Sequence, residues 1–306
     1  MPETTSQLES HESRLELFAE RFKLKDQWEA QVKALNETGV LEILPESQDI
    51  GIVGIDGKEY PIPKYEDILS RINPEKIELL EHKLEQGFSK LQLIPMAMPL
   101  DVLADRYKRE LIKHSKDGTL LSTDNTPLDL NAENPLYVWE EYKGADIEGK
   151  LVYYPKRLDK ENHEGKTKQQ LIDQGDAWEI RLIEETVDIP AQGKGQTIGG
   201  RKQLEANKSP NEYLRLTQED PQYQNEQGLT PESWLVKAIT HLHQTNQQID
   251  DYQGKGKACY LFGVFFHALL GVPVGYFFRG DRRAGLYGSS PGTRNSNYGA
   301  FLSVKI

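Results

Sequence analysis

Residues 258–304 read ACYLFGVFFHALLGVPVGYFFRGDRRAGLYGSSPGTRNSNYGAFLSV, and their composition differs from that of the chain before them. This segment, called the tail below, is aromatic, apolar and rich in glycine, whereas the preceding residues are charged and mostly helical in pattern. Lys, Glu, Gln, Met and Trp fill 80 of the first 257 positions, so the 47 residues of the tail should hold about 15 of them. The tail contains none.

Burial in a core explains only part of this gap. It would deplete Lys, Glu and Gln, but it would also remove Arg and keep Met and Trp. The tail does the opposite, since it retains four arginines and an aspartate: Arg279, Asp281, Arg282, Arg283 and Arg294. The five missing residue types share one property, which is that no codon ending in a pyrimidine encodes them. This pattern favours a mutational process acting on the gene.

Two stretches of the tail carry a resemblance to a known family. GYFFRGDRRAG at 275–285 and SPGTRNSNYGAFLSVKI at 290–306 resemble the C-terminus of C-type-lectin-fold proteins of the formylglycine-generating type. Within that group they are most similar to the variable proteins of diversity-generating retroelements, in particular archaeal or small-bacterial ones. In that family the adenines of a template are copied to random bases, so that Asn codons with a pyrimidine third base come to encode any of fifteen residues. Those fifteen exclude the five types missing here.

The resemblance implies an α+β chain with a C-type lectin-like domain at its C-terminal end. It covers the last third of the chain at most and is clear only over the last 50 residues or so. Ser115–Gly118 ends a predicted helix and is the best candidate for a domain boundary. We therefore expect an α-rich region at 1–117 and a lectin-like domain at 118–306, with a variable region at about 258–304.

Local patterns predict the individual elements. Apolar residues at three- and four-residue spacing, and capping residues such as Asn73-Pro74 and Thr230-Pro231, predict helices over 7–36, 65–72, 75–86, 100–114, 167–174, 209–216 and from 230 onward. Short strands are expected within 40–62, around an Asp56-Gly57 turn, and over 136–139, 149–154, 177–185 and 300–306. Alternation in 177–185 indicates a half-buried strand. Residues 91–99 are expected to be an apolar connector, and residues 186–207 a flexible surface loop.

The tail is rich in side chains that dominate binding interfaces, namely large aromatic rings with few rotamers and a rim of Arg and Asp. The candidate ligand contacts are Tyr260, Phe262, Phe265, Phe266, His267, Leu269, Tyr276, Phe278, Asp281, Leu286 and Tyr287. About half of these should be ordinary core residues, because side chains alternate between the two faces of a strand. Five further residues are expected to support the tail by hydrogen bonding to backbone carbonyls: Arg282, Arg283, Arg294, Asn295 and Asn297.

Nothing in the sequence predicts catalysis. Formylglycine-generating enzymes use a pair of cysteines, and this chain has only Cys259, which is better explained as a buried core thiol. His241 and His243 are two residues apart and would point to different faces of a helix. We expect no metal site, no cofactor and no enzymatic activity. An enzyme or a structural, adhesive module on the same fold remain the alternatives.

The bulk properties narrow the range of partners. A net charge of −11 and a pI of about 5.3 disfavour nucleic acid. The longest apolar run, Ala258–Val274, is too short and too rich in glycine for a membrane helix, and the first residues do not resemble a signal peptide. We expect a protein or small-molecule ligand of unknown identity. Cytoplasmic localisation is the default, and surface display stays open.

Overall fold

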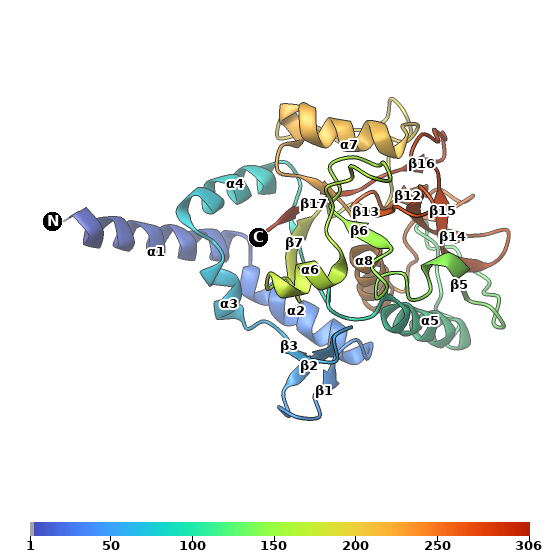
Figure 1. Cartoon of the computed structure of the whole chain (residues 1–306), viewed down its shortest axis with the longest axis horizontal. Helices are drawn as coiled ribbons and strands as arrows, with labels where there is room; N and C mark the ends of the chain where they lie inside the picture. The colour runs from blue at the N-terminus through green and yellow to red at the C-terminus, as the bar shows by residue number, and fades with distance from the viewer. Residues whose placement is uncertain (1–2) are drawn as a thin grey trace.

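The computed structural model describes residues 3–306, with side chains from residue 11 onward, and has a mixed α+β architecture (Figure 1). Its helices are α1 (Glu3–Arg21), α2 (Leu24–Glu37), α3 (Tyr65–Ser70), α4 (Pro74–Glu85), α5 (Leu100–Lys116), α6 (Lys168–Asp173), α7 (Pro210–Glu219) and α8 (Pro231–Thr245), with short 3-10 turns η1 (Glu140–Tyr142) and η2 (Pro221–Tyr223). The predicted α+β class is confirmed at this level. No helix in the described range is both long enough and apolar enough to cross a membrane.

The strands form two main sheets and three small pairings. They are β1 (Glu42–Ile43), β2 (Ile50–Val53), β3 (Glu59–Pro61), β4 (Lys90–Ile94), β5 (Leu136–Val138), β6 (Leu151–Tyr153), β7 (Glu179–Ile183), β8 (Thr197–Ile198), β9 (Arg201–Lys202), β10 (Gln227–Gly228), β11 (Asp251–Tyr252), β12 (Ala258–Tyr260), β13 (Val264–Phe266), β14 (Val272–Phe278), β15 (Arg283–Ser289), β16 (Tyr298–Gly299) and β17 (Leu302–Lys305). One sheet has the order β10-β17-β7-β4. The other has the order β16-β12-β14-β15-β5, with β11 added against β14.

Helix α8 joins the two sheets. Thr230 caps its first turn by accepting a hydrogen bond from the Ser233 amide, and Pro231 occupies the first helical position, as predicted. Its residues from Pro231 to Thr240 are all buried, and it packs against both β4 and β14. Trp234 lies so close to β14 that a Cβ on Gly275 would stand 2.5 Å from the indole ring. Only glycine permits this approach of strand and helix.

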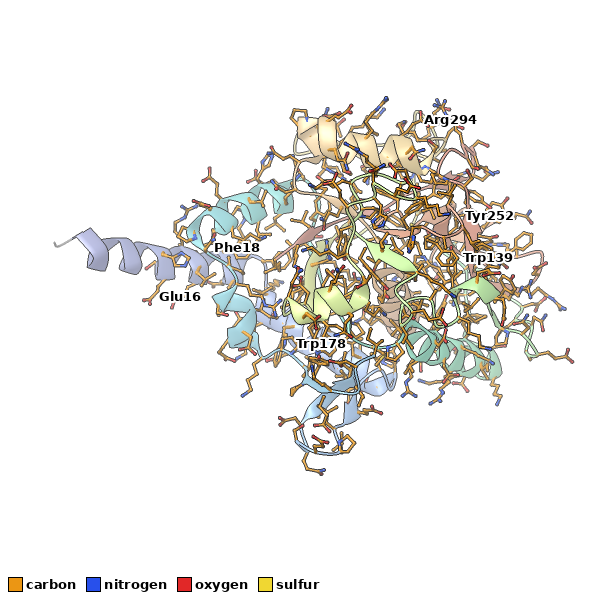
Figure 2. All side chains as sticks on the ribbon, in the orientation of Figure 1. Glu16, Phe18, Trp139, Trp178, Tyr252 and Arg294 are labelled. Atoms are coloured by element: carbon orange, nitrogen blue, oxygen red, sulfur yellow. The ribbon has the colours of Figure 1, made fainter. Side chains whose placement is uncertain are left out.

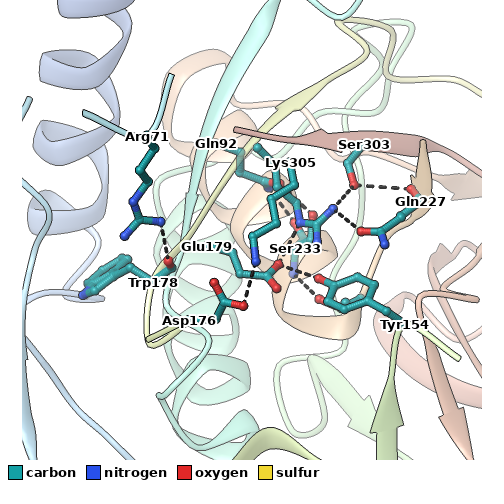
Figure 3. Close-up of polar contacts among 12 residues, drawn as sticks. Arg71, Gln92, Tyr154, Asp176, Trp178, Glu179, Gln227, Ser233, Ser303 and Lys305 are labelled. Carbon is teal, nitrogen blue, oxygen red and sulfur yellow. Dashed lines mark hydrogen bonds and ion pairs between the residues drawn. The ribbon is translucent and has the colours of Figure 1, made fainter. Parts of the chain in front are cut away.

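Strand β7 is buried along its whole length, so the half-buried strand predicted for 177–185 is wrong in its burial. The polar side chains Glu179 and Arg181 lie inside the protein because they pair with each other at 2.7 Å. The Tyr154 hydroxyl donates to Glu179, while the side chains of Gln227 and Ser303 accept from Arg181 (Figure 3). The alternating polar residues that suggested solvent therefore face internal partners.

Strand β4 corrects another prediction, because residues 91–99 were expected to be a connector. Lys90–Ile94 instead pairs antiparallel with β7 from Lys90↔Ile183 to Ile94↔Glu179. This pairing joins segments on either side of the predicted boundary at 117/118 in one sheet, and one hydrophobic core runs through both. The N-terminal residues thus contribute directly to the fold of the C-terminal part.

The predicted helix over 7–36 is divided at Lys23, whose φ of 51° lies in the left-handed region. Helix α1 projects from the body of the molecule, whereas α2 packs against β4 (Figure 1). The Asp56-Gly57 turn is confirmed, since β2 and β3 pair on either side of it. The cap at Asn73 is confirmed as well, because its side chain accepts from the Lys76 amide.

Residues 186–207 are not a plain surface loop as expected. They include the β8–β9 hairpin, and Arg201 within it is buried. Its guanidinium pairs with Glu184 at 2.5 Å and with Glu226 at 2.8 Å. Lys83 from α4 completes the cluster at 2.5 Å from Glu226, so two cations balance two carboxylates. This buried cluster anchors the hairpin.

Candidate binding surface

The tail forms most of the six-stranded sheet, and the register of its strands decides which side chains reach the surface. Gly275 and Phe277 of β14 face α8, so Tyr276 and Phe278 face the opposite side. The paired strands place further aromatic residues on this outer side. Tyr287 of β15 is opposite Val274, which lies on the same side of β14 as Tyr276, and Tyr252 of β11 is opposite Phe278. Strand β16 beside β12 adds Tyr298, and strand β5 beside β15 adds Tyr137.

These rings make up one continuous surface, which we call the aromatic face: Tyr137, Tyr252, Tyr276, Phe278, Tyr287 and Tyr298. Tyr276 and Tyr287 are stacked, with centroids 4.6 Å apart and ring planes 13° from parallel. Tyr252 lies 5.2 Å from Tyr276, 5.5 Å from Phe278 and 5.8 Å from Tyr298. Tyr252 lies at the end of the molecule remote from α1 (Figure 2).

A glycine makes the central stack possible. Gly285 is opposite Tyr276 across the β14–β15 pairing, and a Cβ at this position would overlap the ring of Tyr287. Without a side chain at 285, Tyr287 can lie across the strand and cover Tyr276. The rings thereby hold one another in position, which lowers the entropy that a ligand must remove on binding.

Two arginines border the aromatic face. The Arg283 guanidinium lies 4.9 Å from the centre of the Tyr137 ring and pairs with Asp281 at 2.8 Å. Arg279 forms a bidentate ion pair with the buried Asp251, in which Nε donates to Oδ1 at 2.8 Å and Nη2 donates to Oδ2 at 2.5 Å. Cations and apolar rings therefore meet at the surface.

Three phenols of the aromatic face, those of Tyr276, Tyr287 and Tyr298, stay neutral near physiological pH. Burial raises the pKa of Tyr276, Tyr287 and Tyr298 above the ordinary value for tyrosine. Each can thus donate as well as accept a hydrogen bond. The surface offers flat apolar area with polar tips, a combination common in protein-binding sites.

The structure divides the eleven predicted contact residues into two groups. Six are buried, namely Tyr260, Phe262, Phe265, Phe266, Tyr276 and Leu286. All of them except Tyr276 are at most 1% exposed and cannot meet a ligand without movement, which corrects the prediction for those five. Of the six, only Tyr276 keeps an edge on the aromatic face, with 8% of its surface exposed. The other five, which are at least partly exposed, are His267, Leu269, Phe278, Asp281 and Tyr287.

Each buried ring has a structural reason. Tyr260 shares the outer side of the sheet with Tyr276, but Tyr213 of α7 covers it. Phe262 stacks on the same Tyr213 at 6.0 Å. Phe266 packs in β13 against Trp139 and Tyr142. A helix and a loop from outside the tail therefore close one end of the sheet.

The exposed candidates form two separate sites. Phe278 and Tyr287 belong to the aromatic face, and Asp281 lies in the turn between β14 and β15. Leu269 is 47% exposed in a different loop, in which the ring of His267 lies 5.4 Å from that of His163. Sequence reasoning also missed three members of the aromatic face: Tyr137, Tyr252 and Tyr298. The alternation of Tyr298 could have been read from the tail, whereas the other two join it only through strand pairing.

Four of the five residues expected to support the tail use other partners than predicted, and the fifth, Arg282, is exposed and, among the described residues, makes hydrogen bonds through its backbone alone. Arg283 and Arg294 bind carboxylates rather than backbone carbonyls, the second of them on Glu212 of α7. The Asn297 side chain accepts from Lys257, and the Asn295 side chain accepts from the Asn297 amide. These contacts still tie the tail to α7 and to the entry of β12.

The lone cysteine, the metal-ligating side chains and the cavities bear on whether the chain has a reactive centre. Cys259 is completely buried, and burial raises the pKa of its thiol well above the usual range, so it is a poor nucleophile. Among the described side chains no group of three or more His, Cys, Asp or Glu is arranged to hold a metal. A cavity of about 460 Å³ lies between α7 and residues 154–157, floored by Phe262 and Gly263.

Exposure gives an independent measure of the missing residue types. Between residues 11 and 257 there are 92 exposed positions, of which 46 are Lys, Glu or Gln. The tail has 13 exposed positions, and none of them is Lys, Glu or Gln. At the frequency of the preceding chain six or seven would be expected. Burial therefore does not account for the composition of the tail.

Comparisons of the chain with protein-family models, with curated proteins and with solved structures find no match.

Proposed function

We propose that this chain is a ligand-binding protein with a diversified tail, of the kind found in diversity-generating retroelements. We further propose that residues 118–306 form a C-type lectin-like domain that displays the tail. The observation that carries the proposal is the absence of Lys, Glu and Gln from the 13 exposed positions of the tail. Codons ending in a pyrimidine yield that composition, and solvent exposure alone does not.

The aromatic face is the ligand site in this proposal. It combines constant and variable parts, since Tyr137 and Tyr252 precede the tail, whereas Phe278, Tyr287 and Tyr298 lie within it. Burying each exposed ring against a partner contributes through apolar area, at about 25 cal/mol per Å². Few rotamers are lost on binding, because the rings already pack on one another.

Changing the outer side chains is compatible with the fold. The β14–β15 pairing extends from Val272↔Ser289 to Phe278↔Arg283 through backbone atoms, which every residue except proline can supply. Trp234 and the other residues of α8 hold the inner side of the sheet. Positions 278 and 287 are partly exposed and position 281 is exposed, so substitution there leaves that inner packing unchanged. In this proposal the chain acts by binding, through side chains that can change without disturbing the fold.

Sequencing the DNA around the gene tests the proposal. We expect a near-copy of codons 258–304 beside a reverse transcriptase gene, with adenines where the tail differs. The differing codons should be those of exposed or partly exposed residues such as Asp281, Phe278 and Tyr287, while buried residues such as Leu286 stay constant. A locus without such a copy, or a copy whose differences fall on buried positions, would overturn the proposal.

A further inference from the structure

A second unusual feature lies far from the aromatic face, in the core between α5, α6 and α8. Lys168, the first residue of α6, is fully buried, and its Nζ lies 2.7 Å from Asp146 Oδ2 and 2.8 Å from Glu232 Oε1. The third neighbour of the Nζ is the carbonyl oxygen of Met98, at 2.8 Å. Both carboxylates are at most 1% exposed. An amine and two carboxyl groups thus meet with water excluded.

The surrounding groups fix this arrangement. Asp146 Oδ2 also accepts from the Leu100 amide at 2.9 Å, and Glu232 Oε1 accepts from the Tyr153 hydroxyl at 2.7 Å. Glu232 lies in the first turn of α8, and Tyr153 lies in β6. The Leu100 amide thus holds the Asp146 side chain, and the Tyr153 hydroxyl holds that of Glu232. The relative positions of the reacting groups are set before any chemistry occurs.

The charges of the cluster do not balance when all three groups are ionised. One ammonium and two carboxylates leave a net negative charge in the core, which is costly. One oxygen of each carboxyl group, Asp146 Oδ1 and Glu232 Oε2, has no hydrogen-bond partner among the described residues. A single proton on one carboxyl group restores neutrality. Burial by itself would lower the pKa of Lys168, but the two neighbouring carboxyl groups outweigh it and raise the pKa, so the side chain is an ammonium. Because the Nζ is fully buried, the groups that can take its proton are these two acids.

We propose that Lys168 and Asp146 become joined by an intramolecular amide bond, with Glu232 as the proton-transferring group. Glu232 takes one proton from the Lys168 ammonium, and the free amine attacks Cγ of the protonated Asp146. The Nζ–Cγ bond forms, the bond from Cγ to the hydroxyl oxygen breaks, and the hydroxyl leaves with a proton from Nζ as water. Amine and carboxylic acid give amide and water, Glu232 keeps the proton it took, and no oxidant or reductant is consumed.

The product suits the site better than the starting groups do. The starting cluster holds an ammonium and a carboxylate, whereas the amide and the protonated Glu232 are both uncharged, so no ionised group stays buried in the core. The bond would close the loop from residue 146 to residue 168, which contains β6. Strand β6 pairs with β13 of the tail from Leu151↔Phe266 to Tyr153↔Val264. The new bond would thus fasten a constant strand beside the tail, whichever residues the tail carries.

Mass spectrometry of the intact, denatured full-length chain tests the proposal. We expect the folded wild-type protein to be lighter than its sequence mass by one water molecule, and a digest to contain one branched peptide joining the segments around 146 and 168. Glu232→Gln keeps a side chain of similar size but cannot transfer the proton, and it should show the full sequence mass. Glu219→Gln, on the exposed face of α7, serves as the matched control and should react like the wild type.

One other reaction loses the same mass, namely succinimide formation at an Asp-Gly sequence, and the chain has two of these, Asp56-Gly57 and Asp117-Gly118. Hydroxylamine opens a succinimide but leaves an amide between side chains intact, so treatment before the measurement separates the two. A wild-type chain with its full sequence mass and a folded circular dichroism spectrum would overturn the proposal. So would a mass loss that maps to residue 56 or residue 117. Both results come from the wild-type protein, so they stand even if Glu232→Gln fails to fold.

Discussion

The ring of Tyr252, which precedes the tail, lies 5.2 Å from the ring of Tyr276 within it. Strand β11 brings them together by running parallel to the end of β14, so that Tyr252 is opposite Phe278. The aromatic face is therefore assembled from segments on both sides of the compositional boundary at residue 258. A residue from outside the tail stands at its centre, in contact with three other rings.

Replacing Tyr252 with alanine should weaken binding of most ligands. Ligands can be isolated against the whole chain from a peptide display library and their affinities then measured for each variant. We expect Tyr252→Ala to reduce the free energy of binding by about 1–2 kcal/mol, which is about tenfold in affinity, because central aromatic residues dominate interfaces. Leu17→Ala is the control, since Leu17 is exposed and belongs to α1, a helix at the end of the molecule opposite β14 and β15 (Figure 1). Equal affinities for Tyr252→Ala and the wild type would remove the aromatic face as the binding site.

Gly275→Ala should destabilise the protein by about 1–3 kcal/mol, the usual cost of overpacking. The added methyl group would stand 2.5 Å from the Trp234 ring, so β14 or α8 must shift. Gly292→Ala is the matched control, because a Cβ there meets no atom within 4 Å. Urea unfolding monitored by tryptophan fluorescence measures both. Similar midpoints for the two variants would show that the strand and the helix are not in close contact.

The ion cluster beneath the β8–β9 hairpin gives a third prediction. Glu226→Ala leaves Arg201 and Lys83 buried with only Glu184 to balance them, and it should cost about 3–5 kcal/mol of unfolding free energy. Glu219→Ala removes an exposed partner of Arg215 and should cost less than about 1 kcal/mol. Thermal unfolding of the two variants side by side gives the comparison. A loss for Glu226→Ala no greater than that for Glu219→Ala would contradict a buried cluster.

Stability should fall as pH rises toward neutrality because of Asp250. This carboxyl group is completely buried and accepts from the Trp234 indole at 2.7 Å, and burial raises its pKa to about 7 from 3.8. Since the folded pKa lies above the unfolded one, the contribution of Asp250 is fully present below about 3.8 and is lost as pH rises through 7.

The variant Asp250→Asn isolates this effect, because an amide cannot ionise but still accepts from the indole. We expect the free energy of unfolding of the variant, relative to that of the wild type, to be higher at a pH above 7 than at pH 4. Urea unfolding of both proteins at the two pH values measures this difference. A constant difference between the two proteins across the range would show that Asp250 does not titrate there.

Much of the local structure could be predicted because the signals are local. Asn73-Pro74 and Thr230-Pro231 begin helices through bonds within one turn, and Asp56-Gly57 forms its hairpin from adjacent residues. Such features need no knowledge of the rest of the chain.

The predictions that failed depend on distant partners. Residues 90–94 form a strand only because β7 pairs with them, and β7 is buried on both sides because Arg181 finds Glu179, Gln227 and Ser303 inside. The same limit applies to the candidate site. Alternation predicts that about half of the aromatic residues of the tail face inward, but α7 decides that Tyr260 is covered, and β11 decides that Tyr252 is added.

The position of Tyr137 and Tyr252 outside the tail also bears on what sister genes would share. If only the tail is rewritten, every descendant inherits these two rings, and newly acquired specificities are built around a common stacking platform. The targets of such a repertoire would then be unrelated in sequence yet alike in one respect, each presenting a flat apolar group to the same pair of tyrosines.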